Sequence, residues 1–212
     1  MLSGTPSADF AALLGRSPLV AGVDEAGRGP LAGPVVAAAV VLCKPCVEGV
    51  GDSKAISAPR RAELEGHIRA RCAFGIAVVG PEEIDRLNIF GATMLAMTMA
   101  MTRLCEALGA ECAEALIDGN LTPAGRRMEW RWPARAIVGG DAIEPAIGAA
   151  SILAKEYRDR LMCLAAAEHP HYGWERNKGY GTREHLAALS EHGPTPLHRR
   201  SFSPVSQAEL AF

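Results

Sequence analysis

The sequence predicts an α/β protein. Apolar segments of six to nine residues, several of them rich in β-branched residues, have the length and composition of strands, and they lie at residues 19–24, 34–42, 73–79 and 113–118. Longer segments rich in helix formers lie at residues 58–72, 91–108 and 142–167. Two of the expected strands end in acids that glycine soon follows, at Asp24 and at Asp118. The chain therefore combines strands and helices with charged groups at strand ends.

The first elements are expected to be a hairpin, a helix and a third strand. A Gly/Pro-rich turn separates residues 19–24 from residues 34–42, which favours a hairpin. The helix over residues 58–72 has Ser57 as its expected N-cap and Pro59 in its first turn, where proline costs no hydrogen bond. Residues 73–79 then form the third strand.

The middle of the chain is expected to supply core and a second acidic strand end. The helix over residues 91–108 carries a methionine stripe at helical spacing, which more often marks core than a ligand groove. Residues 113–118 form a fourth strand that ends in Asp118, and residues 128–138, broken by Pro133, form a further extended segment.

The last third begins with a long helix and then changes character. Gly139, Gly140 and Asp141 open a helix expected over residues 142–167, and Asp141 taken alone is a good N-cap candidate. From residue 168 onward, aromatic residues alternate with basic and amide residues, a composition suited to stacking on nucleotides and to phosphate contacts, and a short helix follows at residues 183–189. Trp174 is expected to pack on the core.

The composition indicates one main domain in an ordinary globular chain. The protein has 212 residues, is 49% hydrophobic and carries a formal net charge of −2, so any nucleic-acid contact must depend on a local basic patch. No signal pattern precedes the first strand, and the apolar stretches are too short to cross a bilayer, so a cytoplasmic protein without membrane contact is expected.

Cysteines and histidines outside the acidic segments are expected to have no metal or redox role. Six scattered cysteines fit reduced thiols, and the Cys43/Cys46 pair lacks the second pair that a zinc site needs. His169 and His171 have no acid or cysteine at metal-ligand spacing and are expected to be structural or surface residues.

The acids suggest metal-assisted phosphate chemistry. Asp24 and Glu25 run directly into a Gly-Arg-Gly turn, whose glycines allow backbone N–H groups to approach a sugar-phosphate closely. Carboxylates are the ligands that Mg²⁺ and Mn²⁺ prefer. If Asp118 and Asp141 meet Asp24 at one sheet edge, the acids need cations, and two divalent ions about 3.5–4 Å apart form a clamp for phosphodiester cleavage.

Several ordered segments together carry a family resemblance. From about residue 19 to residue 204 the chain resembles bacterial ribonuclease HII, of the type 2 ribonuclease H family. The segments that carry the likeness are GVDEAGRGPLAGPV at 22–35, DSK at 52–54, IDG at 117–119, GDA at 140–142, AASILAK at 149–155, YRDR at 157–160, KGYGT at 178–182 and HRRSF at 198–202.

The resemblance implies an architecture. It is an RNase H-like fold, a mixed sheet of about five strands flanked by helices with a C-terminal helical portion. Residues 1–167 would form the catalytic core, and residues 168–212 would form a loop and helical portion that completes the substrate groove. The family likeness also implies a monomer.

The resemblance further implies an activity. It is endonucleolytic cleavage of the RNA strand of RNA–DNA hybrids, with cutting on the 5′ side of single ribonucleotides embedded in duplex DNA. Two Mg²⁺ or Mn²⁺ ions would assist the hydrolysis, which would leave 5′-phosphate and 3′-hydroxyl ends.

Site roles carry over to the matching positions. The carboxylates that bind the metal ions would be those of Asp24, Glu25, Asp118 and Asp141. Ribose 2′-OH and phosphate would be contacted by Gly27, Arg28 and Gly29, the neighbouring sugar by Tyr180, and backbone phosphate by Ser53 and Lys54. Asp159 is an auxiliary candidate, either for metal binding or for a pair with Arg158 or Arg160.

Two departures and three rival functions stand beside this interpretation. Residues 55–56 stand where many relatives carry lysine and leucine, and Gly139-Gly140 precedes Asp141 where a lysine is frequent, which puts a phosphate contact in doubt and not the metal site. The rivals are a nuclease or transposase-like enzyme for another nucleic acid, a nucleotide-binding or redox module, and an inactive hybrid-binding protein. The glycine spacing does not match G-x-G-x-x-G, which argues against the second rival.

Overall fold

A computed structural model describes residues 2–4, 18–43, 47–51, 53 and 56–209. Within these residues a six-stranded mixed sheet has the order β1-β4-β3-β2-β5-β6. The strands are β1 (Ser3–Gly4), β2 (Val20–Ala26), β3 (Val35–Val41), β4 (Ala73–Val79), β5 (Glu114–Asp118) and β6 (Ala134–Ile137). The expected mixed sheet is confirmed, and the sixth strand is the two-residue β1, which is too short to show a period-2 pattern.

The sheet changes from antiparallel to parallel at β2. The expected β2–β3 hairpin is antiparallel, and β4 and β1 extend it in the same sense. On the other side, β5 pairs with β2 and β6 pairs with β5, both in parallel. The carboxyl ends of β2, β5 and β6 therefore meet at one edge of the sheet, which is where ligands bind in many α/β proteins.

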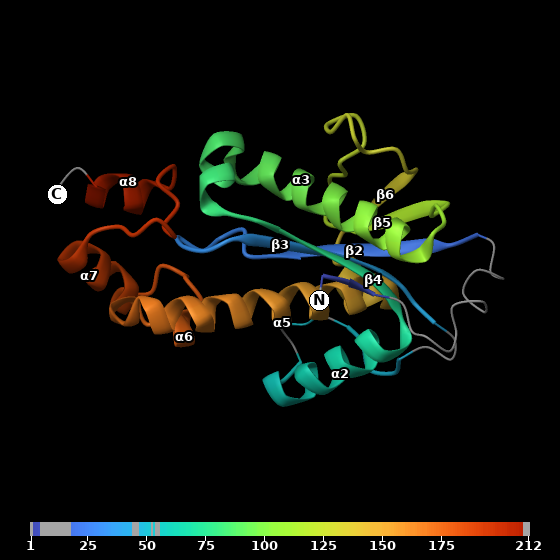
Figure 1. Ribbon diagram of the computed structural model, residues 1–212, viewed down its shortest axis with the longest axis horizontal. Coiled ribbons are helices and arrows are strands. Elements are labelled where there is room, and N and C mark those ends of the chain that lie inside the picture. The colour runs from blue at the N-terminus through green and yellow to red at the C-terminus, as the bar shows by residue number, and fades with distance from the viewer. Residues whose placement is uncertain (1, 5–17, 44–46, 52, 54–55, 210–212) are drawn as a thin grey trace.

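Two long helices cover opposite faces of the sheet (Figure 1). Helix α3 (Pro81–Leu108) packs on one face and α5 (Pro145–Glu168) packs on the other, while α2 (Ala58–Arg71) lies against α5. Every residue of β3 is buried because both of its faces are covered. The methionine stripe belongs to this core, with Met97 and Met101 almost fully buried.

Glycine lets α5 approach the sheet closely. A Cβ placed on Gly22 of β2 would lie 2.1 Å from the Ala146 carbonyl carbon in the first turn of α5. The helix backbone therefore rests directly on the strand that carries Asp24 and Glu25, and the absence of a side chain at Gly22 is what allows it.

Three expected boundaries are wrong. The single helix over residues 142–167 is two helices, α4 (Gly140–Ile143) and α5, because Glu144 is extended and Pro145 starts a new first turn. Asp141 lies inside α4, whose N-cap is Gly139, so Asp141 is not the N-cap. Helix α3 begins at Pro81, ten residues before the expected start, and continues through a non-helical Asn88.

The other differences between the expected and the observed elements are smaller. Only Ala134–Ile137 of the extended segment 128–138 forms a strand. The short helix after residue 182 is α7 (Arg183–His192), and η1 (Pro170–Tyr172), α6 (Trp174–Asn177) and α8 (Ser203–Glu209) accompany it. No helix in the described part of the chain is both long and apolar enough to cross a membrane.

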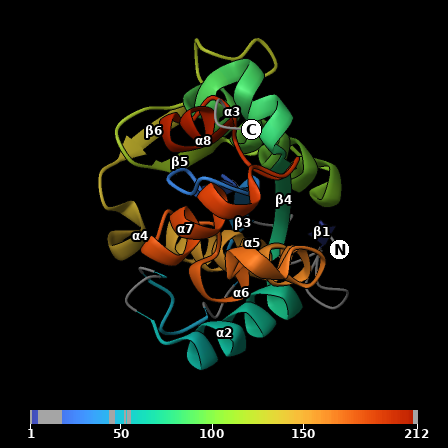
Figure 2. The same cartoon turned by 90° about the vertical axis from the view of Figure 1, so that its left-hand side faces the viewer.

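The C-terminal elements gather at one end of the sheet, where α6, α7 and α8 come to the front in Figure 2. Their small apolar cluster joins Trp174 and Tyr172 to Met162, near the end of α5, and to Ala32 from the turn after β2. Trp174 is fully buried, as expected. The C-terminal elements are thus attached both to α5 and to the loop that follows the Gly-Arg-Gly turn.

Candidate active site

Acidic residues from three elements meet at the carboxyl edge of the sheet. Asp24 and Glu25 lie near the end of β2, and Asp118 ends β5. The register pairs Val23 with Ile117, so Asp24 and Asp118 are the next neighbours across the two strands. Asp141 follows β6 at the start of α4, and its backbone N–H lies 3.4 Å from Asp118 Oδ1. The structure therefore places Asp24, Asp118 and Asp141 at the same edge of the sheet.

Asp24 is a buried carboxylate with acidic neighbours. It is 4% exposed and accepts a hydrogen bond of 2.7 Å from the Glu25 backbone N–H. Burial raises the pKa of Asp24 well above its ordinary value, and the charges of Glu25 and Asp118 raise it further, while the hydrogen bond from the Ser151 hydroxyl acts in the opposite direction. A nearby cation would relieve this burial and repulsion.

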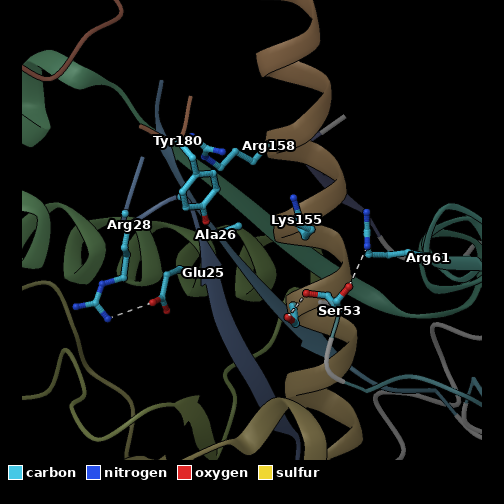
Figure 3. A pocket seen from close by; sticks show the side chains of 11 residues that line it. Glu25, Ala26, Arg28, Ser53, Arg61, Lys155, Arg158 and Tyr180 are labelled. Carbon is cyan, nitrogen blue, oxygen red and sulfur yellow. Dashed lines mark hydrogen bonds and ion pairs between the residues drawn. The ribbon is translucent and has the colours of Figure 1, made fainter. Parts of the chain in front are cut away.

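Glu25 and Asp118 border a second, smaller hollow on the α3 side of the sheet. Glu25 Oε1 lies 3.4 Å from Arg28 Nη1. Figure 3 marks this ion pair with a dashed line. Both acids line this hollow together with Asn120 and residues of α3 such as Met97. Successive strand residues point to opposite faces, and Asp24 and Glu25 follow this rule, with Asp24 on the α5 side.

A cleft of about 570 Å³ begins at this edge and extends along α5. Its walls come from the end of β2, the Gly-Arg-Gly turn, α5 and the C-terminal portion (Figure 3). Lys155 and Tyr180 reach into it from α5 and from the loop before α7. The residues that line it include Glu25, Gly27, Arg28, Gly29, Ser53, Ser151, Lys155, Arg158 and Tyr180. Glu25 of the acidic edge thus shares one cleft with cationic and aromatic side chains.

The Gly-Arg-Gly turn needs its first glycine. Gly27 has φ +100°, a conformation that side chains with a Cβ rarely adopt, and a Cβ there would lie 2.0 Å from Arg158 Nε. Gly29 faces Tyr180, whose Cε1 would lie 3.5 Å from a Cβ at that position. Tyr180 is 48% exposed and therefore has a free ring surface beside the turn.

Ser53 is buried and bonded to the protein. Its hydroxyl lies 2.8 Å from the hydroxyl of Ser151, which also bonds Asp24, and its carbonyl oxygen accepts a hydrogen bond of 2.9 Å from Arg61 Nη1. Lys54 lies outside the described residues. Sequence reasoning missed Ser151 and Arg61 as supporting residues, although Ser151 stands in one of the segments that carry the family likeness.

Asp159 pairs with a different cation from those expected. Both of its carboxylate oxygens accept from Lys155 Nζ, at 2.7 and 2.6 Å. Arg158 instead donates to backbone carbonyls, and Arg160 pairs with Glu65, so the expected pair with Arg158 or Arg160 is wrong. The Lys155–Asp159 pair follows the i,i+4 spacing of α5 and holds Lys155 at the cleft.

The acidic edge has the donor set of a divalent cation site. Its ligands would be hard carboxylate oxygens, which suit Mg²⁺ and Mn²⁺. In the described part of the chain, no group of three or more His, Cys, Asp or Glu side chains is arranged so that it could hold a metal ion. The case for a cation at this edge therefore depends on the shared position of the acids and on Asp24. The carboxylate of Asp24 is buried and repelled by Glu25 and Asp118, so a cation would stabilise it.

Cys43, His169 and His171 contact neighbouring side chains of the protein. Cys43 Sγ lies 3.5 Å from Cys72 Sγ in the core, and Cys46 lies outside the described residues. The His169 ring contacts the buried Trp174 ring edge-on at 5.5 Å, and the His171 ring lies 4.3 Å from that of His192.

A mixed sheet with an acidic carboxyl edge, beside a cleft with arginine, lysine and tyrosine side chains, defines an α/β protein equipped for phosphate chemistry. A family model described as Ribonuclease HII matches residues 21–205. Ribonuclease HII of Novosphingobium aromaticivorans is 72% identical over 191 residues, which cover 89% of this chain and 97% of that protein. Ribonuclease HII of Erythrobacter litoralis is 59% identical over 99% of both chains.

The chain belongs to the ribonuclease HII family. It is therefore an endonuclease, a hydrolase of phosphodiester bonds, and the membership supports ribonuclease H activity on RNA–DNA hybrids. The solved structure of Bst-RNase HIII in complex with Mn²⁺ matches with a TM-score of 0.74 and 20% identity over 98% of this chain and 73% of that one. This likeness shows that the two proteins share a fold.

Proposed function

We propose that the protein cleaves the RNA strand of RNA–DNA hybrids and cuts on the 5′ side of single ribonucleotides embedded in duplex DNA. The observation that supports this most directly is the shared cleft, in which Glu25 of the acidic edge lies beside Gly27, Arg28 and Gly29 of the turn. Chemistry and ribose recognition would therefore act on adjacent atoms of one nucleic-acid strand.

The catalytic carboxylates in this proposal are Asp24, Glu25, Asp118 and Asp141, which would hold two divalent ions, Mg²⁺ or Mn²⁺. When bound, such ions lower the pKa of an attacking water and stabilise the departing 3′-oxygen. The products would carry 5′-phosphate and 3′-hydroxyl ends. A neighbour with the same fold binds Mn²⁺, which supports the choice of metal.

Selectivity for RNA would come from the turn. Only the 2′-OH distinguishes RNA from DNA at a given position, so a backbone that approaches the sugar closely is required, and glycine permits that approach. Gly27, Arg28 and Gly29 would contact the 2′-OH and the adjacent phosphate, and Tyr180 would stack on the neighbouring sugar. The exposed ring of Tyr180 beside Gly29 supports this arrangement.

The other site residues would support these contacts. Lys54 would bind backbone phosphate, and Ser53 would act mainly through Ser151 on Asp24, given its burial. We assign Asp159 an auxiliary role, in which it orients Lys155 at the cleft. Residues 168–212 would complete the substrate groove beyond the core of residues 1–167.

The cellular setting is part of the same proposal. The protein would act as a monomer in the cytoplasm, without membrane contact, in the removal of ribonucleotides from DNA. The net charge of −2 means that the local cations of the cleft, not the overall field, would attract the nucleic acid.

The test is cleavage of an end-labelled DNA duplex that carries one ribonucleotide, with Mg²⁺ or Mn²⁺, beside an RNA–DNA hybrid, an all-DNA duplex and an EDTA control. We expect metal-dependent cutting of the hybrid and cutting 5′ of the single ribonucleotide, with the all-DNA duplex intact. Equal cutting of all-DNA would support the rival nuclease, and binding without cutting would support an inactive hybrid-binding protein.

A further inference from the structure

We propose that Arg158 and Arg199 are positioning residues, whose buried guanidinium groups hold the loop of residues 27–34 with its carbonyl oxygens turned inward and the N–H groups of residues 27–29 turned to the substrate. The inference rests on the proposed function, because it explains how the ribose-reading turn is kept in shape. Arg158 borders the cleft but is 1% exposed, and Arg199 is fully buried, so neither guanidinium group is expected to touch the substrate.

Arg199 is bonded to both ends of this loop. Its Nη2 donates to the Gly27 carbonyl at 2.5 Å, its Nη1 donates to the Arg28 carbonyl at 2.9 Å, and its Nε donates to the Gly33 carbonyl at 2.9 Å. Its backbone N–H also donates to the Leu31 carbonyl at 2.9 Å. One residue, which follows the loop by more than 160 positions, therefore fixes much of its backbone.

Arg158 reaches the same loop from α5. Its Nε donates to the Pro34 carbonyl at 2.9 Å and its Nη2 donates to the Ala32 carbonyl at 3.2 Å. Its Nη1 donates to the Lys178 carbonyl at 3.0 Å, two residues before Tyr180. Arg158 thus couples the loop to the segment that carries the stacking tyrosine, and its Nε packs directly against Gly27.

The backbone hydrogen bonds of the turn involve its carbonyl oxygens and leave its N–H groups available to a ligand. Carbonyl oxygens of Gly27 and Arg28 are occupied by Arg199, whereas the N–H groups of residues 27–29 donate to no acceptor in the part of the chain that the structure describes. All three residues line the cleft. Unbonded backbone donors beside a cleft are suited to an oxygen-rich ligand such as a phosphate or a sugar hydroxyl.

The two guanidinium groups also place positive charge behind the loop. Arg158 is 1% exposed and Arg199 is fully buried, and neither forms an ion pair with a carboxylate among the described residues. Burial lowers the pKa of Arg199 to about 9, so it remains charged at neutral pH. A buried cation without a carboxylate partner is costly for folding, which fits a functional reason for its position.

The experiment compares Arg199→Lys and Arg158→Lys with Arg160→Lys, a matched control two positions along α5 whose side chain pairs with Glu65 outside the cleft. Lysine keeps the charge but cannot make the forked bonds to several carbonyls. Cleavage of the single-ribonucleotide duplex is measured as kcat/KM per folded molecule, and the amide hydrogen exchange of residues 27–33 is measured in the same proteins.

We expect kcat/KM to fall about tenfold or more for each of the two variants and to stay near the wild-type value for Arg160→Lys. Faster exchange is expected at Leu31 and Gly33, whose N–H groups donate to the Gly179 and Leu197 carbonyls. A lower melting temperature with wild-type kcat/KM would show that the arginines only stabilise the fold, and this would overturn the proposal. If a variant does not fold, Arg199→Gln, which keeps part of the donor set, gives the same readouts. Failure of the wild type to cut would instead contradict the proposed function.

Discussion

At the residue scale, a few acidic side chains of the site have surroundings that differ from those of ordinary surface acids. Asp24 is buried, has acidic neighbours and accepts hydrogen bonds from Ser151 and from the backbone. A buried carboxylate with acidic neighbours is unfavourable without a nearby positive charge and is stabilised by a cation. The residue-scale predictions therefore concern the acids and the tyrosine of the cleft.

Substitution of one acid should separate activity from stability. Asp118→Asn is expected to lower kcat/KM by about 100-fold or more, since one carboxylate ligand is lost, while the free energy of unfolding stays equal or rises because a like charge is removed. Steady-state cleavage and thermal unfolding measure both quantities. The control is Glu114→Gln, at the other end of the same strand and paired with Arg135. Near-normal turnover of Asp118→Asn would overturn the metal-site assignment.

Tyr180 should matter most where a single ribonucleotide is read. Tyr180→Ala is expected to lower kcat/KM about tenfold on a duplex with one ribonucleotide and less on a long hybrid, because the exposed ring loses its stacking surface at one junction. Tyr180→Phe keeps the ring and should behave like the wild type. Equal losses on both substrates would contradict a junction-reading role.

At the element scale, the close approach of α5 to β2 positions the site. Gly22→Ala is expected to lower the free energy of unfolding by about 3 kcal/mol, because its Cβ would meet the α5 backbone at 2.1 Å. Denaturant unfolding measures the loss. Gly66→Ala, on the exposed side of α2 with no atom within 4 Å of the new Cβ, should be neutral or stabilising. Similar stability of both variants would contradict the packing account.

Most strands and the acidic edge could be predicted from the sequence because their local composition is distinctive. Strands β2 to β5 are apolar and end in turn residues, so their local composition is informative. The break between α4 and α5 was missed although Pro145 marks a helix start, because the small apolar residues around it suit one long helix.

The supporting contacts of the site could not be predicted. Ser151 and Arg158 lie on a helix, where sequence spacing alone shows neither what they bond nor how deeply they are buried. Arg199 bonds carbonyls more than 160 residues away, and no local pattern reports such a contact. The resemblance included these residues in its segments but did not assign them a role.

At the scale of the whole molecule, the C-terminal portion contains a buried histidine network and accepts backbone hydrogen bonds from the loop of residues 27–34 at the Gly179 and Leu197 carbonyls. His198 Nε2 lies 3.1 Å from His185 Nε2, and His185 Nδ1 lies 2.9 Å from the Tyr180 carbonyl oxygen. His198 Nδ1 accepts from the Thr195 backbone N–H at 2.9 Å, so His198 is neutral with its proton on Nε2. Protonation of either ring would disrupt these bonds.

Acid should therefore destabilise the protein through this network. Burial lowers the pKa of His198 from 6.5 to about 3, so between these values the unfolded chain binds a proton that the folded chain does not. The contribution of neutral His198 to the free energy of unfolding is complete above about pH 6.5 and is lost as the pH falls toward 3. Unfolding measured across this range should show a smaller pH slope for His198→Gln than for the wild type. An unchanged slope would contradict the buried neutral assignment.

Anomalous diffraction from crystals soaked in Mn²⁺ tests most directly whether the acidic edge binds the divalent ions used in cleavage. We expect Mn²⁺ to be coordinated by the carboxylates of Asp24, Glu25, Asp118 and Asp141. The anomalous signal should be reduced or lost in Asp118→Asn crystals. Mn²⁺ bound elsewhere in the cleft, or an edge without Mn²⁺ at concentrations that support cleavage, would contradict this expectation.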